Sequence, residues 1–306
     1  MGKKRKHHYV PRLYLKGWAV NNQIYTLRDG SIFLTALENV ANKRDFYRLN
    51  PITTDGLQLI ETFLKDIPPA IKNKFKELID LLSHISNLFY SIKENNNIAS
   101  IQTEIDNLLN DLVENLYAQI EGDATPYIED LRNGNAQFWN NEDVFLDFVT
   151  FLCFQYTRTD CMQENALNSM PEKYKNSWGV LRILIALSII GKINYEYEDW
   201  TLELLNNCTI LPFITGGQPV INLCQVEGKE VKEMILYYPV SPKYAINTVS
   251  SLCLTSPISV RSSLELLHVC LEQARRTSDN FSERKSKTIF FFAGIVHLLY
   301  IASCFP

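Results

Sequence analysis

The chain has 306 residues, of which 46% are apolar and 21% carry a charge, a balance typical of soluble globular proteins. The net charge of −4 argues against a protein whose whole surface binds nucleic acid, although it leaves room for a local basic patch. The 7 cysteines form no CxxC pair and show no zinc-ligand spacing with histidine, so we expect reduced thiols in a cytoplasmic protein and no metal site. The residues identify no cofactor.

The chain opens with a run of cations that leads directly into two adjacent histidines, His7 and His8. Histidine titrates near neutral pH and often transfers protons, while lysine and arginine hold phosphate groups. One interpretation is a catalytic pair of histidines beside an anion-binding group that consists of Lys4, Arg5, Lys6, Tyr9 and Arg12. The other interpretation is a flexible basic arm over residues 1–8, which leads into a helix begun by Pro11 and leaves one histidine with a structural role.

A β-hairpin is predicted over residues 23–35, because Asp29-Gly30 separates two runs of β-prone residues. Apolar residues at helical spacing around Glu61 then predict a helix. If Glu61 is buried beside the histidines, it is a candidate acid, base or metal ligand. If it lies at the solvent edge of the helix, it carries no chemistry.

Two long helices with apolar stripes, joined by an asparagine turn, predict a helical hairpin over residues 69–121. The polar stretch 122–141 contains glycine and proline and predicts a connection. A helix rich in aromatic residues is expected from Glu142 to about Asn165, with Gln155, Arg158 and Thr159 on one face. Because an unpaired buried arginine is costly, we expect Arg158 to reach solvent, pair with a carboxylate or bind an anionic ligand.

Residues 178–193 are apolar on almost all sides and predict a buried helix. A small C-terminal sheet is predicted, with strands at residues 209–215, 220–223 and 234–238 and a fourth candidate at 243–248. Thr215 and Gln218 border a Gly-Gly turn, which permits close approach to a ligand but more often serves only as a turn.

The expected fold class is α+β and mainly α, with a long helical hairpin, a helical core, an N-terminal β-hairpin and a small C-terminal β-sheet. We expect one domain over residues 1–255, followed by a C-terminal helix and an apolar tail over residues 256–306. The helix is predicted for residues 262–279.

The apolar tail has two interpretations. Residues 289–305 reach the lower length limit of a membrane span, and cations precede them, as in a cytoplasmic protein with a C-terminal anchor. The same residues suit a buried strand followed by a core helix equally well. The predicted localisation is therefore cytoplasmic, with membrane association through the tail as the alternative.

Three parts of the sequence together resemble one microbial family, that of domain of unknown function 4238. They are the His8-Tyr9-Val10-Pro11 opening with Tyr14-Leu15, the segment 155–159, and the runs 213–220 and 238–242. The resemblance covers roughly residues 7–280. Some bacterial members lie among antiphage defence genes, so the resemblance implies an intracellular antiviral role. Relatives usually carry an acidic residue where this chain has Gly217, which implies altered chemistry here if that carboxylate is catalytic.

Three functional hypotheses follow. The first is an antiviral defence protein and candidate nuclease, with His7, His8, Arg158 and Glu61 as catalytic residues and weak nucleic-acid binding by the basic arm. Its other binding residues are those named in the opening motif together with Gln155, Thr159, Thr215 and Gln218. The second is a non-enzymatic sensor or binding module for a phage or host protein. The third is a membrane-acting effector anchored by residues 289–305.

Overall fold

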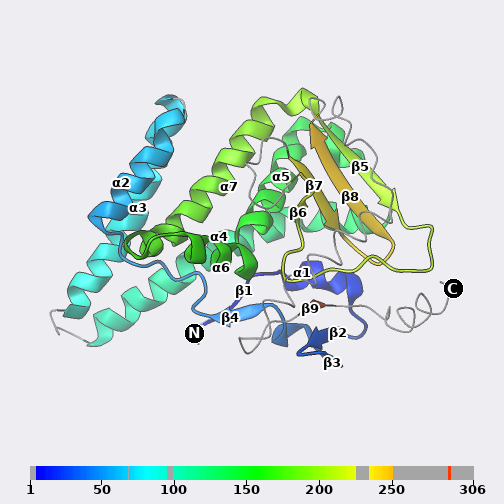
Figure 1. Cartoon of the computed structure of the whole chain (residues 1–306), viewed down its shortest axis with the longest axis horizontal. Helices are drawn as coiled ribbons and strands as arrows, with labels where there is room; N and C mark the ends of the chain where they lie inside the picture. Colours follow the sequence, from blue (N-terminus) through cyan, green and yellow to red (C-terminus); the bar gives the residue numbers. More distant parts are fainter. Residues whose placement is uncertain (1–4, 68, 95–98, 225–233, 251–288, 291–306) are drawn as a thin grey trace.

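The computed structural model describes residues 5–67, 69–94, 99–224, 234–250 and 289–290. Helices form the centre and one flank of this part of the chain, and a small antiparallel sheet lies on the other flank (Figure 1). The N-terminal strands lie along one edge, below the central helices in the view of Figure 1. The fold class is therefore α+β and mainly α, as the sequence predicts.

The basic N-terminal segment is ordered from its first described residues. Strand β1 (Lys6–His8) pairs antiparallel with β4 (Asn42–Arg44), which places His7 opposite Lys43. The flexible arm predicted for residues 1–8 is thus wrong for residues 6–8, because these residues form backbone hydrogen bonds with a neighbouring strand. Residues 1–4, including Lys4, lie outside the described residues.

The predicted β-hairpin is confirmed. Helix α1 (Arg12–Leu15) and the 3-10 turn η1 (Lys16–Trp18) precede the hairpin. Its strands are β2 (Gln23–Arg28) and β3 (Ser31–Ala36), which pair antiparallel. The short turn η2 (Leu37–Asn39) then connects β3 with β4. Asp29 and Gly30 both have positive φ, at 50° and 73°. A two-residue hairpin turn whose twist matches that of the strands requires positive φ at both central residues. Asp-Gly adopts these angles readily, which explains why the pair predicts a hairpin.

The predicted helical hairpin is confirmed, but its second helix is longer. After α2 (Thr54–Phe63) and η3 (Leu64–Asp66), helix α3 (Pro69–Glu94) is followed by α4 (Ala99–Arg132). The connection predicted for residues 122–141 is wrong up to Arg132, since α4 continues through Gly122 and Pro126. A buried stripe at helical spacing holds the helix together despite these breakers, and it consists of Val113, Tyr117, Ile120, Ala124, Ile128 and Leu131.

The predicted helix from Glu142 to about Asn165 is two helices, α5 (Glu142–Thr157) and α6 (Asp160–Ser169), after the short turn η4 (Gln137–Asn140). The break occurs at Thr159, whose extended backbone (φ −74°, ψ 160°) caps α6, and whose hydroxyl accepts a hydrogen bond from the Met162 amide at 3.4 Å. Threonine favours such cap positions over helix interiors. The 3-10 segment η5 (Glu172–Ser177) then leads into the buried helix α7 (Trp178–Tyr195), as predicted. Helix α7 packs on α5 in the core.

The C-terminal sheet has the strand order β5-β8-β7-β6, with all neighbours antiparallel. After η6 (Tyr197–Asp199), its strands are β5 (Trp200–Asn206), β6 (Ile221–Asn222), β7 (Ile235–Pro239) and β8 (Tyr244–Ser250). The strand predicted at residues 209–215 is wrong, because the Asn207 side chain folds Thr209 into a turn through a hydrogen bond of 2.9 Å. Strand β5 was missed, although Trp200, Leu202 and Leu204 alternate with polar residues.

Of the C-terminal tail, the structure describes Ile289–Phe290. They form strand β9, which pairs antiparallel with β2 and places Phe290 opposite Thr26. The helix predicted for residues 262–279 and the rest of the apolar tail lie outside the described residues. Within the described residues, one segment, Glu172–Tyr195, has the length and hydropathy of a membrane span, and 56% of its apolar window is buried inside the fold, as in core helices.

Arg132, at the end of α4, ties the N-terminal motif to the C-terminal sheet. Its Nη2 donates to the carbonyl oxygens of Leu13 at 2.9 Å and Tyr14 at 2.7 Å, and its Nε donates to the Val240 carbonyl at 3.0 Å. Gly17 lies against this junction, where an added Cβ would come 2.4 Å from the Val240 oxygen. Only a residue without a side chain therefore fits at position 17.

Substituting Gly17→Ala is expected to lower the free energy of unfolding by about 2 kcal/mol, because backbone atoms must move to admit the methyl group. Gly122→Ala is the matched control, since an added Cβ in this exposed turn of α4 meets nothing within 4 Å. The control is expected to be neutral or stabilising by up to about 1 kcal/mol. Urea denaturation of both variants measures the difference, and equal stabilities would contradict the close contact.

Candidate anion-binding site

His7 has a fixed position inside the fold. Its side chain is fully buried and stacks on the ring of Tyr47, with centroids 5.3 Å apart and planes 12° from parallel. The Tyr47 backbone N–H donates to His7 Nδ1 at 3.0 Å, so the ring proton of the neutral imidazole is on Nε2. The Tyr47 hydroxyl in turn donates to the His8 carbonyl at 2.9 Å. These contacts make the histidine pair a support for Tyr47.

His8 is partly buried and lies among cations. Its pKa is lowered from 6.5 to about 4, mainly by burial and in addition by the positive charges of Arg12, Lys6 and Arg158. Its Nδ1 atom is buried and has no hydrogen-bond partner. His8 is therefore neutral at pH 7, and a base with so low a pKa accepts protons poorly at that pH. Its predicted catalytic role stays a prediction.

The pKa of His8 predicts how stability changes with pH. Because the folded-state pKa of about 4 lies below the unfolded value of 6.5, the unfolded chain binds more protons between these values. The contribution of His8 to stability is therefore complete above about pH 6.5 and is lost as the pH falls toward 4. A His8→Gln variant is expected to lose less stability than the parent between pH 7.5 and pH 5 in urea denaturation. Parallel losses in the two proteins would contradict the lowered pKa.

Arg158 is buried, with all of its polar atoms engaged inside the fold. Its Nε and Nη2 donate to Gln155 Oε1 at 3.1 and 2.8 Å, and its Nη1 donates to Glu121 Oε1 at 2.8 Å. Its guanidinium lies 4.9 Å from the ring centroid of Tyr117. Of the outcomes predicted for Arg158, the structure has the ion pair, and Glu121 supplies the carboxylate.

Glu61, the carboxylate predicted for this site, is exposed on α2 and has no ion pair among the described residues. It occupies the solvent-edge position that was the alternative interpretation. Glu121 was missed as a site residue although it is the last residue of the predicted helical hairpin, next to the stretch interpreted as a connection. Its position one helical turn from the buried Tyr117 is the signal that could have identified it.

The other predicted binding residues join the three sequence motifs to one another. Gln155 donates to the Tyr9 carbonyl at 3.3 Å, Thr159 hydrogen-bonds to Gln218, and Tyr14 shares a hydrogen bond of 2.6 Å with Thr215. The opening motif, the 155–159 segment and the Gly-Gly turn thus meet in the interior. Of the four predicted cations of the opening motif, the three that the structure describes are nearer the surface. Arg5 pairs with Asp45 at 3.7 Å, Lys6 donates to Asn39 at 3.2 Å, and Arg12 is exposed.

A second buried arginine, Arg182 on α7, was missed by the sequence reasoning. Its side chain is only 1% exposed, and its guanidinium carbon lies 5.0 Å from the Tyr47 ring centroid and 5.7 Å from that of Phe46. Its Nη1 donates to Gln163 Oε1 at 3.4 Å, whereas its Nε and Nη2 are buried without an acceptor. A single arginine inside the apolar run of α7 is the signal that could have identified it.

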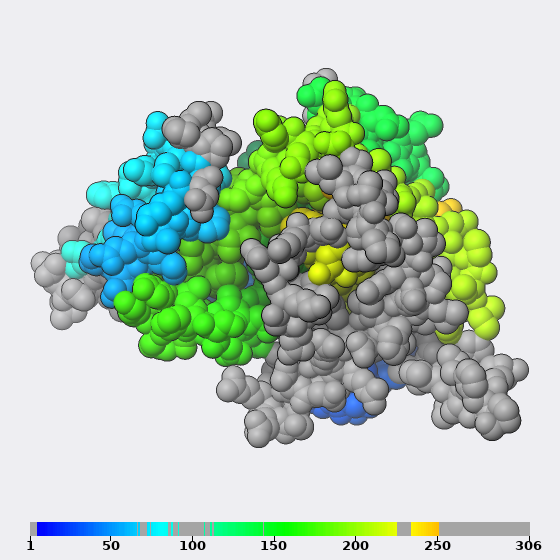
Figure 2. All heavy atoms as spheres, turned by 45° about the horizontal axis from the view of Figure 1, so that its top comes forward, coloured from blue at the N-terminus to red at the C-terminus, as the bar shows by residue number. Residues whose placement is uncertain are grey.

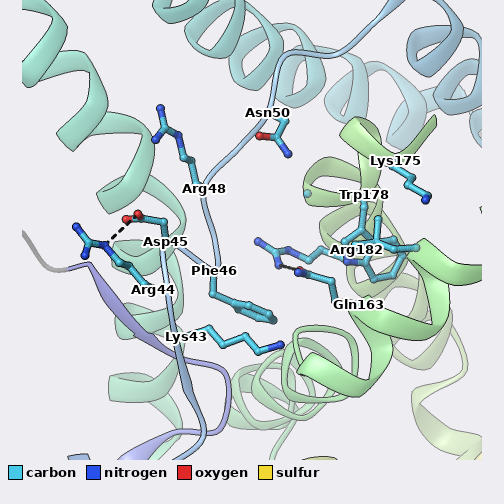
Figure 3. Close-up of a pocket in the computed structure, with 12 residues that line it drawn as sticks. Lys43, Arg44, Asp45, Phe46, Arg48, Asn50, Gln163, Lys175, Trp178 and Arg182 are labelled. Atoms are coloured by element: carbon cyan, nitrogen blue, oxygen red, sulfur yellow. Dashed lines mark hydrogen bonds and ion pairs between the residues drawn. The ribbon is translucent and has the colours of Figure 1, made fainter. Parts of the chain in front are cut away.

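Arg182 lines a cavity of about 280 Å³ between the strand β4, the segment that follows it, and the helices α6 and α7. Figure 3 shows its guanidinium extending from α7 beside Gln163 toward the segment that follows β4. The lining carries one carboxylate, Asp45, and five cationic side chains: Lys43, Arg44, Arg48, Lys175 and Arg182. The lining therefore carries more cationic than acidic side chains.

Some of these cations have acidic neighbours, and Arg182 has none among the described residues. Lys43 pairs with Asp160 at 2.5 Å, Lys175 pairs with Glu172 at 2.6 Å, and Arg44 approaches Asp45 at 3.6 Å. The side chains of Lys43 and Arg44 are 43% and 73% exposed, so they lie at the rim of the cavity. Figure 2 shows one outer face of the molecule, on which α2 and α3 lie beside the segment from α6 to η5.

Tyr47 connects the opening motif with this cavity. One contact is the stacked His7 ring, a second is the Arg182 guanidinium, and a third is the Tyr117 ring at 4.5 Å, which also contacts Arg158. Burial raises the pKa values of Tyr47 and Tyr117, so both hydroxyls stay neutral. The arrangement can bind an anion at Arg182. Among the described residues, no group of three or more histidine, cysteine or acidic side chains is placed to hold a metal ion.

Comparison with protein families found a match to the family described as "Protein of unknown function (DUF4238)", over residues 6–258. Neither the curated proteins nor the solved structures contain a match. The family match includes the β1–β4 pair, both buried arginines and the C-terminal sheet. Because it spans more than half of the sequence, the chain belongs to the family of domain of unknown function 4238.

Proposed function

We propose that this protein is an intracellular antiviral defence protein of the sensor type, which recognises a phosphate-bearing ligand in the Arg182 cavity. The observation that carries the ligand binding is the buried guanidinium with two donor atoms that lack an acceptor, and the antiviral role follows from what the family resemblance implies. An arginine side chain stays protonated in proteins, and a buried charge without a partner costs several kcal/mol. Such a cost is tolerated where function requires the charge. An anionic ligand supplies the missing acceptors.

Binding is better supported than catalysis by the surroundings of the predicted catalytic residues. His7 Nδ1 and the guanidinium of Arg158 form hydrogen bonds within the fold. Glu61 is exposed on α2, whereas Arg158 directly follows α5. The sensor hypothesis needs only a ligand whose binding changes the free energy of the surrounding elements. The cavity is suited to this role, since its walls come from three segments that are separate in sequence: residues 43–50, 163–167 and 175–182.

Inorganic phosphate is the probe that tests the proposal. Sodium phosphate is expected to raise the Tm of the parent protein above its value in sodium chloride of equal ionic strength. A ligand present at ten times its dissociation constant stabilises by about 1.4 kcal/mol. The Arg182→Met variant is expected to show no such difference. Lys192→Met is the matched control, because it removes an exposed cation from the same helix.

The proposal is abandoned if the parent responds equally to phosphate and chloride, or if Arg182→Met responds as the parent does. The Arg182→Met variant also has an expected stability in the absence of phosphate, because methionine fills much of the arginine volume without leaving a buried charge. It is therefore expected to be at least as stable as the parent in the absence of phosphate.

A further inference from the structure

We infer that the Arg182 cavity takes the terminal phosphate monoester of a nucleotide chain, and not the phosphodiesters along the chain. The inference rests on the proposed function, because it names the ligand class for the same cavity. Its basis is the depth at which Arg182 lies, the geometry of its free donors, and the position of the other cations.

The free donors of Arg182 form one edge of the guanidinium plane. Nε and Nη2 lie side by side, and together they make the parallel pair of hydrogen bonds that arginine forms with phosphate or carboxylate oxygens. The third nitrogen, Nη1, already donates to Gln163. Trp178, which also lines the cavity, has a buried indole N–H without an acceptor. Two residues that line the cavity thus carry three buried hydrogen-bond donors without an acceptor.

A phosphate monoester matches this set of donors better than a carboxylate or a phosphodiester. A carboxylate has two oxygens and one negative charge, and a phosphodiester has two free oxygens and one charge. A monoester has three free oxygens and a charge of about −1.5 to −2 near pH 7. The lining holds five cationic side chains, and although Lys43, Arg44 and Lys175 have acidic partners, the buried Arg182 forms no ion pair among the described residues. A buried cation without an ion pair favours the ligand with the larger negative charge.

The depth of Arg182 favours the end of a chain. Arg182 is 1% exposed, whereas Lys43 and Arg44 reach solvent at the rim. A phosphodiester is bonded to the chain on both sides, so two chain segments would have to enter the cavity with it. A terminal phosphate is bonded on one side, so only one segment enters with it. The cavity of about 280 Å³ greatly exceeds the roughly 10–15 Å³ that a single water needs, so the attached sugar also has room.

The exposed cations at the rim then lie where the following phosphates of the strand would emerge. Arg44, at 73% exposure, is the clearest of these. Exposed cations hold backbone phosphates without reading sequence and make binding salt-dependent. The buried floor therefore provides selectivity for the end, and the rim adds affinity for a strand over a single nucleotide.

The experiment compares one short single-stranded DNA in three forms, with a 5′-phosphate, with a 3′-phosphate, and with hydroxyls at both ends. Fluorescence anisotropy with the full chain is expected to show at least tenfold tighter binding of one phosphorylated form than of the hydroxyl form. Arg182→Met is expected to remove this preference, and Lys192→Met to keep it. Arg44→Ser is expected to weaken all forms by a similar factor and to reduce the salt dependence.

The outcomes of this experiment distinguish the possible phosphate-bearing ligands. Equal binding of all three DNA forms, with the phosphate effect on Tm intact, rejects the terminal-phosphate inference and leaves the proposed function standing. Loss of the phosphate effect on Tm rejects both. If adenosine monophosphate binds as tightly as the phosphorylated DNA, the inference that the ligand is the end of a strand is wrong, and the ligand is a free nucleotide. A phosphorylated peptide that competes fully at equal concentration would overturn the nucleotide class.

Discussion

Replacing Arg158 by methionine is expected to lower the free energy of unfolding by about 3–5 kcal/mol, the cost of breaking a buried ion pair by removing one partner. The substitution removes the three hydrogen bonds to Gln155 and Glu121 and the contact with the Tyr117 ring. It leaves the fully buried Gln155 carbonyl without its donors. Urea denaturation monitored by circular dichroism measures the loss.

The exposed Arg12 provides the control, and Arg12→Met is expected to change stability by less than about 0.5 kcal/mol. Glu121→Gln should lose less than Arg158→Met, since the amide oxygen still accepts from Nη1. If Arg158→Met were as stable as the parent, the ion pair would have no structural role, and a functional role for Arg158 would gain support.

Replacing His7 by alanine is expected to lower the free energy of unfolding by about 3 kcal/mol. The change empties the space of a fully buried ring and leaves the Tyr47 amide without its acceptor. Since Tyr47 also contacts the Arg182 guanidinium, the response of Tm to phosphate is expected to weaken as well. The same denaturation and phosphate measurements test both effects.

His8→Ala is the companion variant, and at pH 7.5 it is expected to stay within about 1 kcal/mol of the parent, the range of ordinary substitutions. A catalytic pair would give the opposite pattern, with stability kept and activity lost in both variants. A stable His7→Ala protein with a normal phosphate response would contradict the structural role assigned to His7.

The sequence was informative wherever one local rule governed the structure. Asp29-Gly30 predicted its hairpin because positive φ is a local requirement, and the apolar run of α7 predicted a buried helix. Local rules failed where tertiary packing opposed them. Gly122 and Pro126 suggested a connection, yet the buried stripe of α4 passes through both. Thr159 ended a helix that the aromatic pattern alone would have continued.

The candidate site was predicted in part for the same reason. His7, His8 and Arg158 stood out by residue type, and the structure places them near one another through Tyr47 and Tyr117. Glu121 and Arg182 did not stand out, because a carboxylate on a long helix and one arginine in an apolar helix are common. Glu121 matters because its partner Arg158 lies 37 residues away in the sequence. Arg182 matters because two of its donor atoms are buried without an acceptor. Neither property is visible in a sequence before the chain is folded.

The junction around Arg132 also determines when a growing chain can fold during translation. Tyr14 contacts Thr215 across 201 residues, and the Trp18 indole N–H donates to the Phe213 carbonyl across 195 residues. The opening motif therefore leaves the ribosome long before its partners exist, and at about 5–20 residues per second the delay is at least roughly ten seconds. Contacts so distant in sequence also slow folding after release. The nascent N-terminus thus stays exposed to chaperones and proteases throughout this interval, and ribosomes that stall before residue 213 release chains that cannot complete the core.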